Sequence, residues 1–238
     1  MASLNTFAAE AVPVERRASL RIPASPRLGG RRVRGTNMRR RLSDNPAKRV
    51  LDLAVTAPLL VLLAPLMAVL AVLIRLDSPG PVLFRQTRTG LRGRPFFILK
   101  FRTMTVLEDG ETIVQAAKDD QRVTRVGRFL RKTSLDELPQ LFNVLMGEMS
   151  LVGPRPHALA HDRHYGALID NYALRQRVKP GITGWAQING HRGATPTLEL
   201  MQTRVRHDAW YAQRVNVALD LRILLATPFA ILGQRNAY

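Results

Sequence analysis

The segment from Leu53 to Ile74 reads LAVTAPLLVLLAPLMAVLAVLI, which is twenty-two residues without a charged side chain. A run of this length and composition is long enough to cross the hydrocarbon core of a bilayer as a helix. It begins about fifty residues into the chain, which does not fit a cleaved signal peptide. The segment therefore predicts a membrane helix, with the buried core helix of a soluble domain as the alternative.

Basic residues flank this run on both sides, and by the positive-inside rule both of its ends belong in the cytoplasm. They are Arg39, Arg40, Arg41, Lys48 and Arg49 before the run, and Arg75, Arg85 and Arg88 after it. Pro65, near the middle, removes a backbone hydrogen bond and forces a kink, and Pro58 can add a second bend. We predict a re-entrant helix hairpin over residues 46–76 at the cytoplasmic face of the inner membrane, in preference to a straight span.

The net charge of +18 is concentrated at the start of the chain, where residues 1–49 hold twelve basic and three acidic side chains. This stretch is rich in Arg, Pro, Gly and Ser, so residues 1–45 are predicted to be a disordered basic arm. Anionic lipid is its expected partner, and nucleic acid is the less favoured alternative. The absence of cysteine excludes disulfides and thiolate metal sites and fits a reducing compartment.

The remainder, residues 77–238, is predicted to be a cytoplasmic domain of mixed elements. Two strands, VLFRQTR and PFFILKFRTM, are expected to pair as a small β-hairpin. Helices are expected at residues 125–132, from Leu138 to Gly147, at 157–177, 196–214 and 216–232, with a Gly-rich functional loop at 179–193. The fold class is therefore α+β, a mainly helical monotopic membrane protein with amphipathic C-terminal helices expected at the interface. The last of these helices, 216–232, has core packing as its alternative.

Two acidic residues stand side by side in SLDELPQL, Ser134 to Leu141. One interpretation is a capping box, in which Ser134 caps a helix and Glu137 lies three residues further on, although Pro139 would disturb that helix. The other is a site for a polyanion, because Arg125, Arg128, Arg131 and Lys132 precede the pair and Arg155 follows it. Mg²⁺ held by one or two carboxylates and substrate phosphates would relieve the repulsion between the two charges.

Several motifs together resemble the bacterial sugar transferase family, the polyprenyl-phosphate sugar-1-phosphate transferases. They are KRVLDL, SPGPVLFRQ, KFRTM, RVGRFLRKTSLDELPQLFNVL, MSLVGPRPHALAH and VKPGITGWAQINGHRG, in this order over about residues 47–227. The resemblance implies a monotopic enzyme that moves a sugar 1-phosphate from a UDP-sugar to undecaprenyl phosphate and releases UMP. Glucose 1-phosphate or galactose 1-phosphate is the implied group, for exopolysaccharide or capsule synthesis.

The resemblance also implies roles for particular residues. Asp136 would be the nucleophile that forms an aspartyl phospho-sugar intermediate, and Glu137 would bind the required Mg²⁺. Lys100, Arg131 and Arg155 match the basic positions that handle phosphate, and Asp208 matches a further acidic position. One departure is that the helix break, commonly Ser-Pro in the family, is Ala64-Pro65 here. The missing hydroxyl puts the stability of the bend in doubt, but not the kink.

Further candidates come from the residues themselves. Lys100 and Arg102 alternate along a strand and would face one side, either towards the substrate or as an exposed strand face. The Gly-rich loop offers an aromatic plane and polar groups for the uracil or sugar, namely Trp185, Gln187, Asn189 and Arg192, with core packing of Trp185 as the alternative. The spacing of His157, His161 and His164 also allows a zinc site, which is less favoured than hydrogen bonding.

A second class of function stays open from the sequence alone. In this alternative the protein is a non-catalytic membrane adaptor, its basic arm binds nucleic acid or anionic lipid, and the acidic pair only caps a helix. Turnover of a UDP-sugar distinguishes the two classes. The sequence does not decide the oligomeric state, so a homo-oligomer is neither required nor excluded.

Overall fold

The apolar run forms most of helix α2, Pro46–Asp77, the first element in a computed structural model that describes residues 45–105, 120–193 and 195–233. The predicted disordered arm, residues 1–45, lies outside the described residues except for Asn45. Asn45 caps the helix, because its side chain accepts a hydrogen bond from the Ala47 N–H at 3.0 Å. Pro46 follows at the first helical position, where its missing N–H costs nothing.

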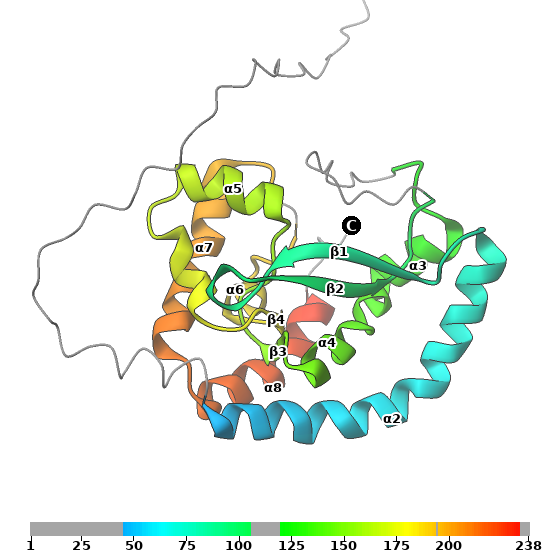
Figure 1. Cartoon of the computed structure of the whole chain (residues 1–238), viewed down its shortest axis with the longest axis horizontal. Helices are drawn as coiled ribbons and strands as arrows, with labels where there is room; N and C mark the ends of the chain where they lie inside the picture. The colour runs from blue at the N-terminus through cyan, green and yellow to red at the C-terminus, as the bar shows by residue number, and fades with distance from the viewer. Residues whose placement is uncertain (1–44, 106–119, 194, 234–238) are drawn as a thin grey trace, which may run out of the picture. The chain divides into compact units, whose positions relative to one another are not determined.

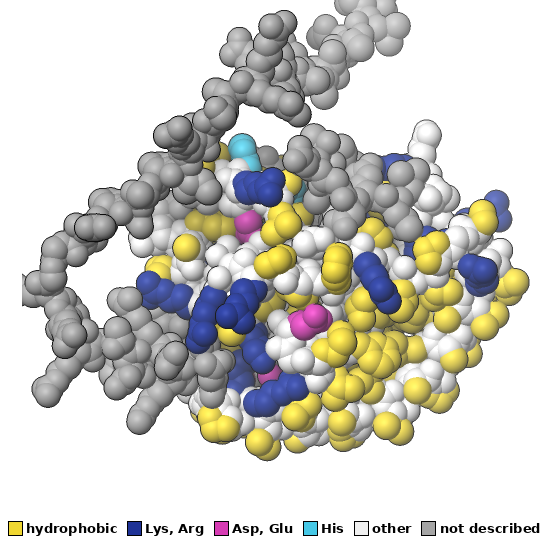
Figure 2. Space-filling view, in the orientation of Figure 1, with side chains coloured by type: hydrophobic (Ala, Val, Ile, Leu, Met, Phe, Trp, Pro, Cys, Tyr) yellow, Lys and Arg dark blue, Asp and Glu magenta, His cyan; other side chains and the backbone are white. Residues whose placement is uncertain are grey.

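Helix α2 bends along its length, and Figure 1 shows its second part turning away from the line of the first. Pro58 and Pro65 both lie inside the helix, where each removes a hydrogen-bond donor. Among the described residues α2 is the one helix long and apolar enough to cross a membrane, and only 17% of its most apolar window is buried. This exposure does not fit the buried core helix of a soluble domain. Figure 2 shows the hydrophobic side chains along its course.

The predicted β-hairpin is confirmed. Strands β1, Leu83–Thr89, and β2, Pro95–Phe101, pair antiparallel with Phe84 opposite Lys100. The short 3-10 turn η1, Leu91–Gly93, joins them and contains Arg92 and Gly93 at φ values of 57° and 76°. The outer edge of β2 is closed by a side chain from another element, because Asn143 bonds the backbone of Phe97 at 2.7 Å and that of Leu99 at 2.9 Å.

Three short helical elements follow the hairpin. They are α3, Arg125–Thr133, the 3-10 turn η2, Leu135–Glu137, and α4, Gln140–Met146. Helix α4 ends at Gly147, as predicted, in the left-handed conformation at φ 84°. The helical spacing of Leu138, Leu141, Phe142 and Leu145 predicts one stripe that faces the core. This prediction is partly wrong, because Phe142 and Leu145 are 40% and 41% exposed. The helix starts only after Pro139, and its buried face carries Gln140, Leu141, Asn143 and Val144.

The next part of the chain differs from the predicted pattern in two places. Residues 157–177 form two elements in place of one helix: α5, Leu159–Leu168, and the 3-10 helix η3, Tyr172–Arg177. Asn171, at φ 62°, separates them. The Gly-rich segment is also not a plain loop, because it contains β4, Gly181–Thr183, and the short helix α6, Trp185–Ile188. Strand β4 pairs parallel with β3, Ser150–Val152.

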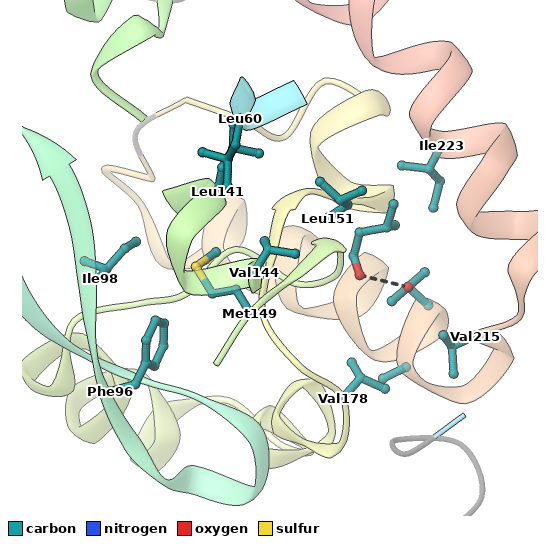
Figure 3. Packing of buried hydrophobic residues seen from close by; sticks show 13 residues of the cluster. Leu60, Phe96, Ile98, Leu141, Val144, Met149, Leu151, Val178, Val215 and Ile223 are labelled. Atoms are coloured by element: carbon teal, nitrogen blue, oxygen red, sulfur yellow. Dashed lines mark hydrogen bonds between the residues drawn. The ribbon is translucent and has the colours of Figure 1, made fainter. Parts of the chain in front are cut away.

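The two C-terminal helices are confirmed as α7, Leu198–Arg214, and α8, Val217–Gly233. They close the main core, in which β2, α4, β3 and α7 meet the first part of α2 (Figure 3). Its buried members include Leu60, Ile98, Val144, Leu151 and Tyr211. A second cluster joins Leu70 and Ile74 of α2 to Phe101 and Leu130. The predicted α+β class with mainly helical content therefore holds, and both parts of α2 pack on the same unit.

Candidate active site

The acidic pair lies in the turn η2, between two helices that both stop short of it. Helix α3 ends at Ser134, which adopts a left-handed conformation at φ 59°. Pro139 then precedes α4, so a continuous helix through this segment is excluded. The capping-box interpretation is wrong, because Ser134 makes no side-chain cap bond and its hydroxyl instead accepts a hydrogen bond from Arg192 Nη2 at 2.8 Å.

Glu137 is buried and holds two cations from distant parts of the chain. Its Oε1 accepts from Lys100 Nζ at 2.9 Å and from Arg155 Nη2 at 2.5 Å, and its Oε2 accepts from Arg155 Nη1 at 3.2 Å. The forked bond with Arg155 is the geometry in which a guanidinium binds a carboxylate most strongly. These three residues were predicted to share one site, and the structure brings them together.

The two adjacent carboxyl groups have opposite electrostatic environments. Burial raises the pKa of Glu137, but Arg155 and Lys100 outweigh burial and hold this pKa well below its usual range. For Asp136 burial dominates, and together with the nearby Glu137 charge it raises the pKa to about 6 against the pull of Lys100 and Arg155. Among the described residues no hydrogen bond or ion pair holds the Asp136 carboxylate. Asp136 is therefore the member of the pair left available for chemistry.

Separate elements fix the positions of the two cations. Lys100 comes from β2. Asn143 of α4 bonds the edge of this strand, which fixes β2 relative to α4 and the turn before it. Arg155 lies between Pro154 and Pro156, which restrict its backbone. The Arg155 carbonyl oxygen also accepts a hydrogen bond from Arg175 Nη2 at 2.5 Å.

Two further predicted basic residues lie near this turn. Arg192 reaches it through Ser134, and burial lowers the pKa of the Arg192 guanidinium while Glu137 and Asp136 act in the opposite direction. Arg131, in the last turn of α3, has its Nη1 3.7 Å from Met104 Sδ. Its charge also lowers the pKa of Asp136. The turn therefore has basic side chains from four separate segments around it.

Four other predicted site residues have their contacts elsewhere. Arg102 lies beyond the end of β2 and is buried at the C-terminal end of α2, where it donates to the Ser78 carbonyl at 2.5 Å and the Pro79 carbonyl at 2.8 Å. Asp208 is buried in α7 and pairs with Arg175 at 2.9 Å. Trp185 stacks on Trp210 with ring centroids 4.6 Å apart, and Gln187 donates to the Ile182 carbonyl at 3.1 Å. The core-packing alternative for Trp185 thus has a partner in the structure.

The less favoured zinc site does not form. Across the described ranges, no group of three or more His, Asp or Glu side chains is arranged to hold a metal ion. His157 instead lies within 2.7 Å of both Tyr172 Oη and Arg175 Nη1 through its Nδ1. Burial and Arg175 lower the His157 pKa well below its usual range, so the ring is neutral. Mg²⁺ takes one or two carboxylates plus substrate phosphates, so the residues whose chemistry suits this ion are Glu137 and its neighbour Asp136.

Sequence reasoning missed Arg175, the buried guanidinium behind Arg155. It occurs in the basic run ALRQRVK, where nothing in composition or spacing distinguishes it from Arg177 two residues later. Only the fold separates them, because Arg175 is 4% exposed whereas Arg177 is exposed to solvent.

Known proteins align with most of this chain. A protein of Caulobacter vibrioides, named UDP-glucose:undecaprenyl-phosphate glucose-1-phosphate transferase, is 54% identical over 83% of this chain and 74% of its own length. An Escherichia coli protein of the same name is 51% identical over 80% of this chain but 41% of its own length. The exopolysaccharide production protein PSS of Rhizobium leguminosarum bv. phaseoli is 44% identical over 82% of this chain and its whole length.

The chain thus spans about two fifths of the length of several curated relatives, including the one from E. coli. The family model described as bacterial sugar transferase matches residues 43–234, which contain α2, the acidic turn and both C-terminal helices. The chain belongs to the bacterial sugar transferase family.

Proposed function

We propose that this protein transfers a sugar 1-phosphate from a UDP-sugar to undecaprenyl phosphate and releases UMP. The names of the relatives from C. vibrioides and E. coli support this reaction and favour glucose 1-phosphate over galactose 1-phosphate. The name of the R. leguminosarum relative supports a role in exopolysaccharide production. In this role the reaction is the first membrane step, because it attaches the first sugar to the lipid carrier.

The observation that carries the proposal is that only one of the two acidic side chains is held by hydrogen bonds and ion pairs. Glu137 is held by Lys100 and Arg155, whereas the Asp136 carboxylate beside it has no such bond among the described residues. An aspartate whose pKa is about 6 is largely ionised at neutral pH. It is then a nucleophile next to a cluster of cations, the arrangement that phosphoryl transfer needs.

In the proposed first step, an Asp136 carboxylate oxygen attacks the phosphorus that carries the sugar. A new O–P bond forms, the P–O bond to the bridging diphosphate oxygen breaks, and UMP leaves with that oxygen. In the second step a phosphate oxygen of undecaprenyl phosphate attacks the same phosphorus and releases Asp136. Lys100 and Arg155 would neutralise charge on the phosphoryl oxygens, and Glu137 orients both cations.

The Mg²⁺ requirement belongs to the same proposal. Glu137 would hold the ion together with diphosphate oxygens, and the ion would supply further neutralisation of the diphosphate charge. A carboxylate has about four lone-pair sites, and Lys100 and Arg155 occupy three on Glu137, so one remains for a metal. Together with diphosphate oxygens, this single carboxylate meets the minimum that Mg²⁺ uses with phosphates, and Asp136 stays available as the nucleophile.

The proposed location is the cytoplasmic face of the inner membrane, with α2 re-entrant. Support comes from the two ends of α2, which are both anchored in the same unit. Lys48 Nζ lies 2.6 Å from Asp220 Oδ2 of α8, and near the other end Asp77 Oδ2 accepts from the Val126 N–H of α3 at 3.0 Å. A helix that crossed the bilayer once would separate these ends by the full membrane thickness.

The experiment is to incubate purified protein with Mg²⁺, undecaprenyl phosphate and a panel of UDP-sugars while UMP release is followed. We expect turnover with UDP-glucose, loss of turnover on addition of EDTA, and none for Asp136→Asn. Unchanged turnover in Asp136→Asn would exclude this residue as the nucleophile. No turnover by the wild-type protein with any donor would contradict the proposed function and favour the adaptor alternative.

A further inference from the structure

A buried ionic cluster lies behind Arg155 and does not touch the acidic pair. Its centre is Arg175 of η3, which is 4% exposed. Asp208 Oδ2 of α7 accepts from Arg175 Nε at 3.1 Å and from Nη2 at 2.9 Å. Among the described residues neither Arg175 nor Asp208 bonds to Asp136 or Glu137. Asp208 is 2% exposed, so both partners are buried away from solvent and bind other parts of the protein.

The contacts of Arg175 converge on the segment that carries Arg155. Its Nη2 donates to the Arg155 carbonyl at 2.5 Å, and its Nη1 lies 2.7 Å from His157 Nδ1. A single planar group thus touches the chain at Arg155 and again two residues later. Because the donors of a guanidinium are fixed in one plane, these bonds define the position of the segment more closely than a lysine could.

Asp208 keeps this guanidinium charged and in place. Burial lowers the pKa of Arg175, but Asp208, with smaller contributions from Tyr172 and Asp162, outweighs burial and raises this pKa above its usual value. Arg175 Nε and Nη2 both donate to the same Asp208 oxygen, and these two bonds fix the rotation of the guanidinium plane so that Nη2 also reaches the Arg155 carbonyl. The chain of contacts then runs from α7 through Asp208, Arg175 and the Arg155 backbone to the bonds between Arg155 and Glu137.

We infer that Arg175, held by Asp208, is a positioning residue for Arg155. It fixes the Arg155 backbone so that the guanidinium reaches Glu137 and the diphosphate in one geometry. The inference rests on the proposed function and gives Asp208 a role that differs from substrate contact. Through Asp208, helix α7 would then influence catalysis without a side-chain contact to the acidic turn among the described residues.

The test is a double-mutant cycle with Arg175→Gln, Arg155→Lys and the double variant, assayed by UMP release in the presence of Mg²⁺. Arg175→Gln is expected to lower kcat by about 10- to 100-fold, with KM for the UDP-sugar changed by less than about threefold, because misplacement by about 1 Å is sufficient for such a loss. In the Arg155→Lys background, Arg175→Gln should lower kcat by less than about threefold. The forked bond that depends on the positioning is then already lost.

Arg177→Gln is the matched control, since it removes an exposed arginine from the same 3-10 helix, and its kcat is expected within about twofold of wild type. If Arg175→Gln does not fold, Asp208→Asn replaces it in the same cycle, because it keeps the side-chain volume and weakens the grip on Arg175. A general loss of stability would reduce activity equally in both backgrounds. Equal losses, or no loss in the wild-type background, would overturn the inference.

The outcomes also separate this inference from the proposed function. If wild-type protein and Arg177→Gln release no UMP from any UDP-sugar, the proposed function fails. If both turn over and the effect of Arg175→Gln is the same with Arg155 or Lys at that position, only the positioning role fails.

Discussion

Asp136 and Glu137 are neighbours in sequence but should affect stability in opposite directions. The folded protein raises the pKa of Asp136 from 3.8 to about 6, mainly by burial, so its ionised form opposes folding. Between these two pKa values the folded state binds more protons than the unfolded state, so this contribution to stability falls as the pH rises. We expect Asp136→Asn to increase the free energy of unfolding by about 1–2 kcal/mol at pH 7–8 without Mg²⁺. This is less than the full pKa shift corresponds to, because Asp136 is partly exposed and solvent screens its charge. The gain should disappear below about pH 4.

Chemical denaturation of wild type and Asp136→Asn between pH 4 and 8 is the measurement. The same pKa predicts an acidic limb near pH 6 in kcat/KM, because the nucleophile must be ionised. An Asn variant that is less stable than wild type at pH 8 would contradict the raised pKa. In many enzymes, residues that are needed for activity lower the stability of the folded protein in this way.

Glu137→Gln should have the opposite effect. It leaves Lys100 and Arg155, whose side chains are only 18% and 27% exposed, without their anion. We expect the free energy of unfolding to fall by about 1–3 kcal/mol at pH 7, less than for a fully buried pair because both cations reach solvent. The loss of stability relative to wild type is fully present above the ordinary glutamate pKa of about 4.3. It fades as the pH falls through the depressed pKa of Glu137 in the folded protein.

The control for Glu137→Gln is Glu199→Gln, an exposed glutamate at the start of α7. It should change stability by less than about 0.5 kcal/mol in the same denaturation experiment. If Glu137→Gln loses no more free energy of unfolding than Glu199→Gln, the bonds of Glu137 to Lys100 and Arg155 do not stabilise the fold.

At the scale of single residues, the sequence predicted the chemistry of the site better than its geometry. Adjacent acids in a basic stretch, and an arginine between two prolines, are visible in the printed letters, and their motifs match a family. The left-handed conformation of Ser134 is not visible there, because serine rarely adopts it. Arg102 shows the reverse error, since a strand pattern placed it beside Lys100 whereas it binds carbonyls at the end of α2.

At the scale of elements, α3 packs so closely on the chain after β2 that one position has no room for a side chain. A Cβ on Gly127 would lie 2.2 Å from the Thr103 carbonyl oxygen and 2.8 Å from the Thr103 carbonyl carbon. Alanine favours an isolated helix over glycine by about 1 kcal/mol, but here both clashing atoms belong to the backbone and cannot rotate away. We expect Gly127→Ala to lower the free energy of unfolding by about 1–3 kcal/mol.

Gly166→Ala in α5 is the matched control, because its Cβ would meet only Tyr172 Cδ1 at 3.9 Å. It should be neutral or slightly stabilising in a thermal melt. Equal melting temperatures for the two alanine variants would show that α3 moves freely against residues 103–105, which would also weaken the link between α3 and the acidic turn that follows it.

The hairpin and the C-terminal helices, which have strong local signals, were predicted correctly, whereas strand β4, which depends on a distant partner, was not. The hairpin and helices α7 and α8 follow from period, turns and caps that lie within each segment. Strand β4 is only three residues long and exists because it pairs with β3, about thirty residues earlier in the chain. At their contact a Cβ on Gly181 would lie 2.0 Å from the Gly153 nitrogen, so the glycines that suggested a loop instead permit close approach of two strands.

At the scale of the whole molecule, the described unit holds both ends of a long apolar helix while leaving most of its surface uncovered. Near its start, Lys48 bonds Asp220 and also donates to the Val152 carbonyl at 2.9 Å, and Asp52 accepts from the Leu151 N–H at 3.0 Å. Flanking charges predicted that both ends lie on one side of the membrane. They could not identify Asp220 as the partner, because it lies 172 residues away.

This anchoring leads to a prediction about topology that the absence of cysteine makes direct to test. Single cysteines are introduced as Ala47→Cys and Pro81→Cys, exposed positions beside the two ends of α2, and intact spheroplasts are treated with a membrane-impermeant maleimide. If α2 is re-entrant, neither position is labelled until the membrane is permeabilised, because both ends then face the cytoplasm. A helix that crosses once would expose one of the two positions, so labelling of either in intact spheroplasts would exclude the re-entrant arrangement. Retained UMP release in both variants would show that the anchored fold is unchanged, and the labelling pattern would then report the native position of α2.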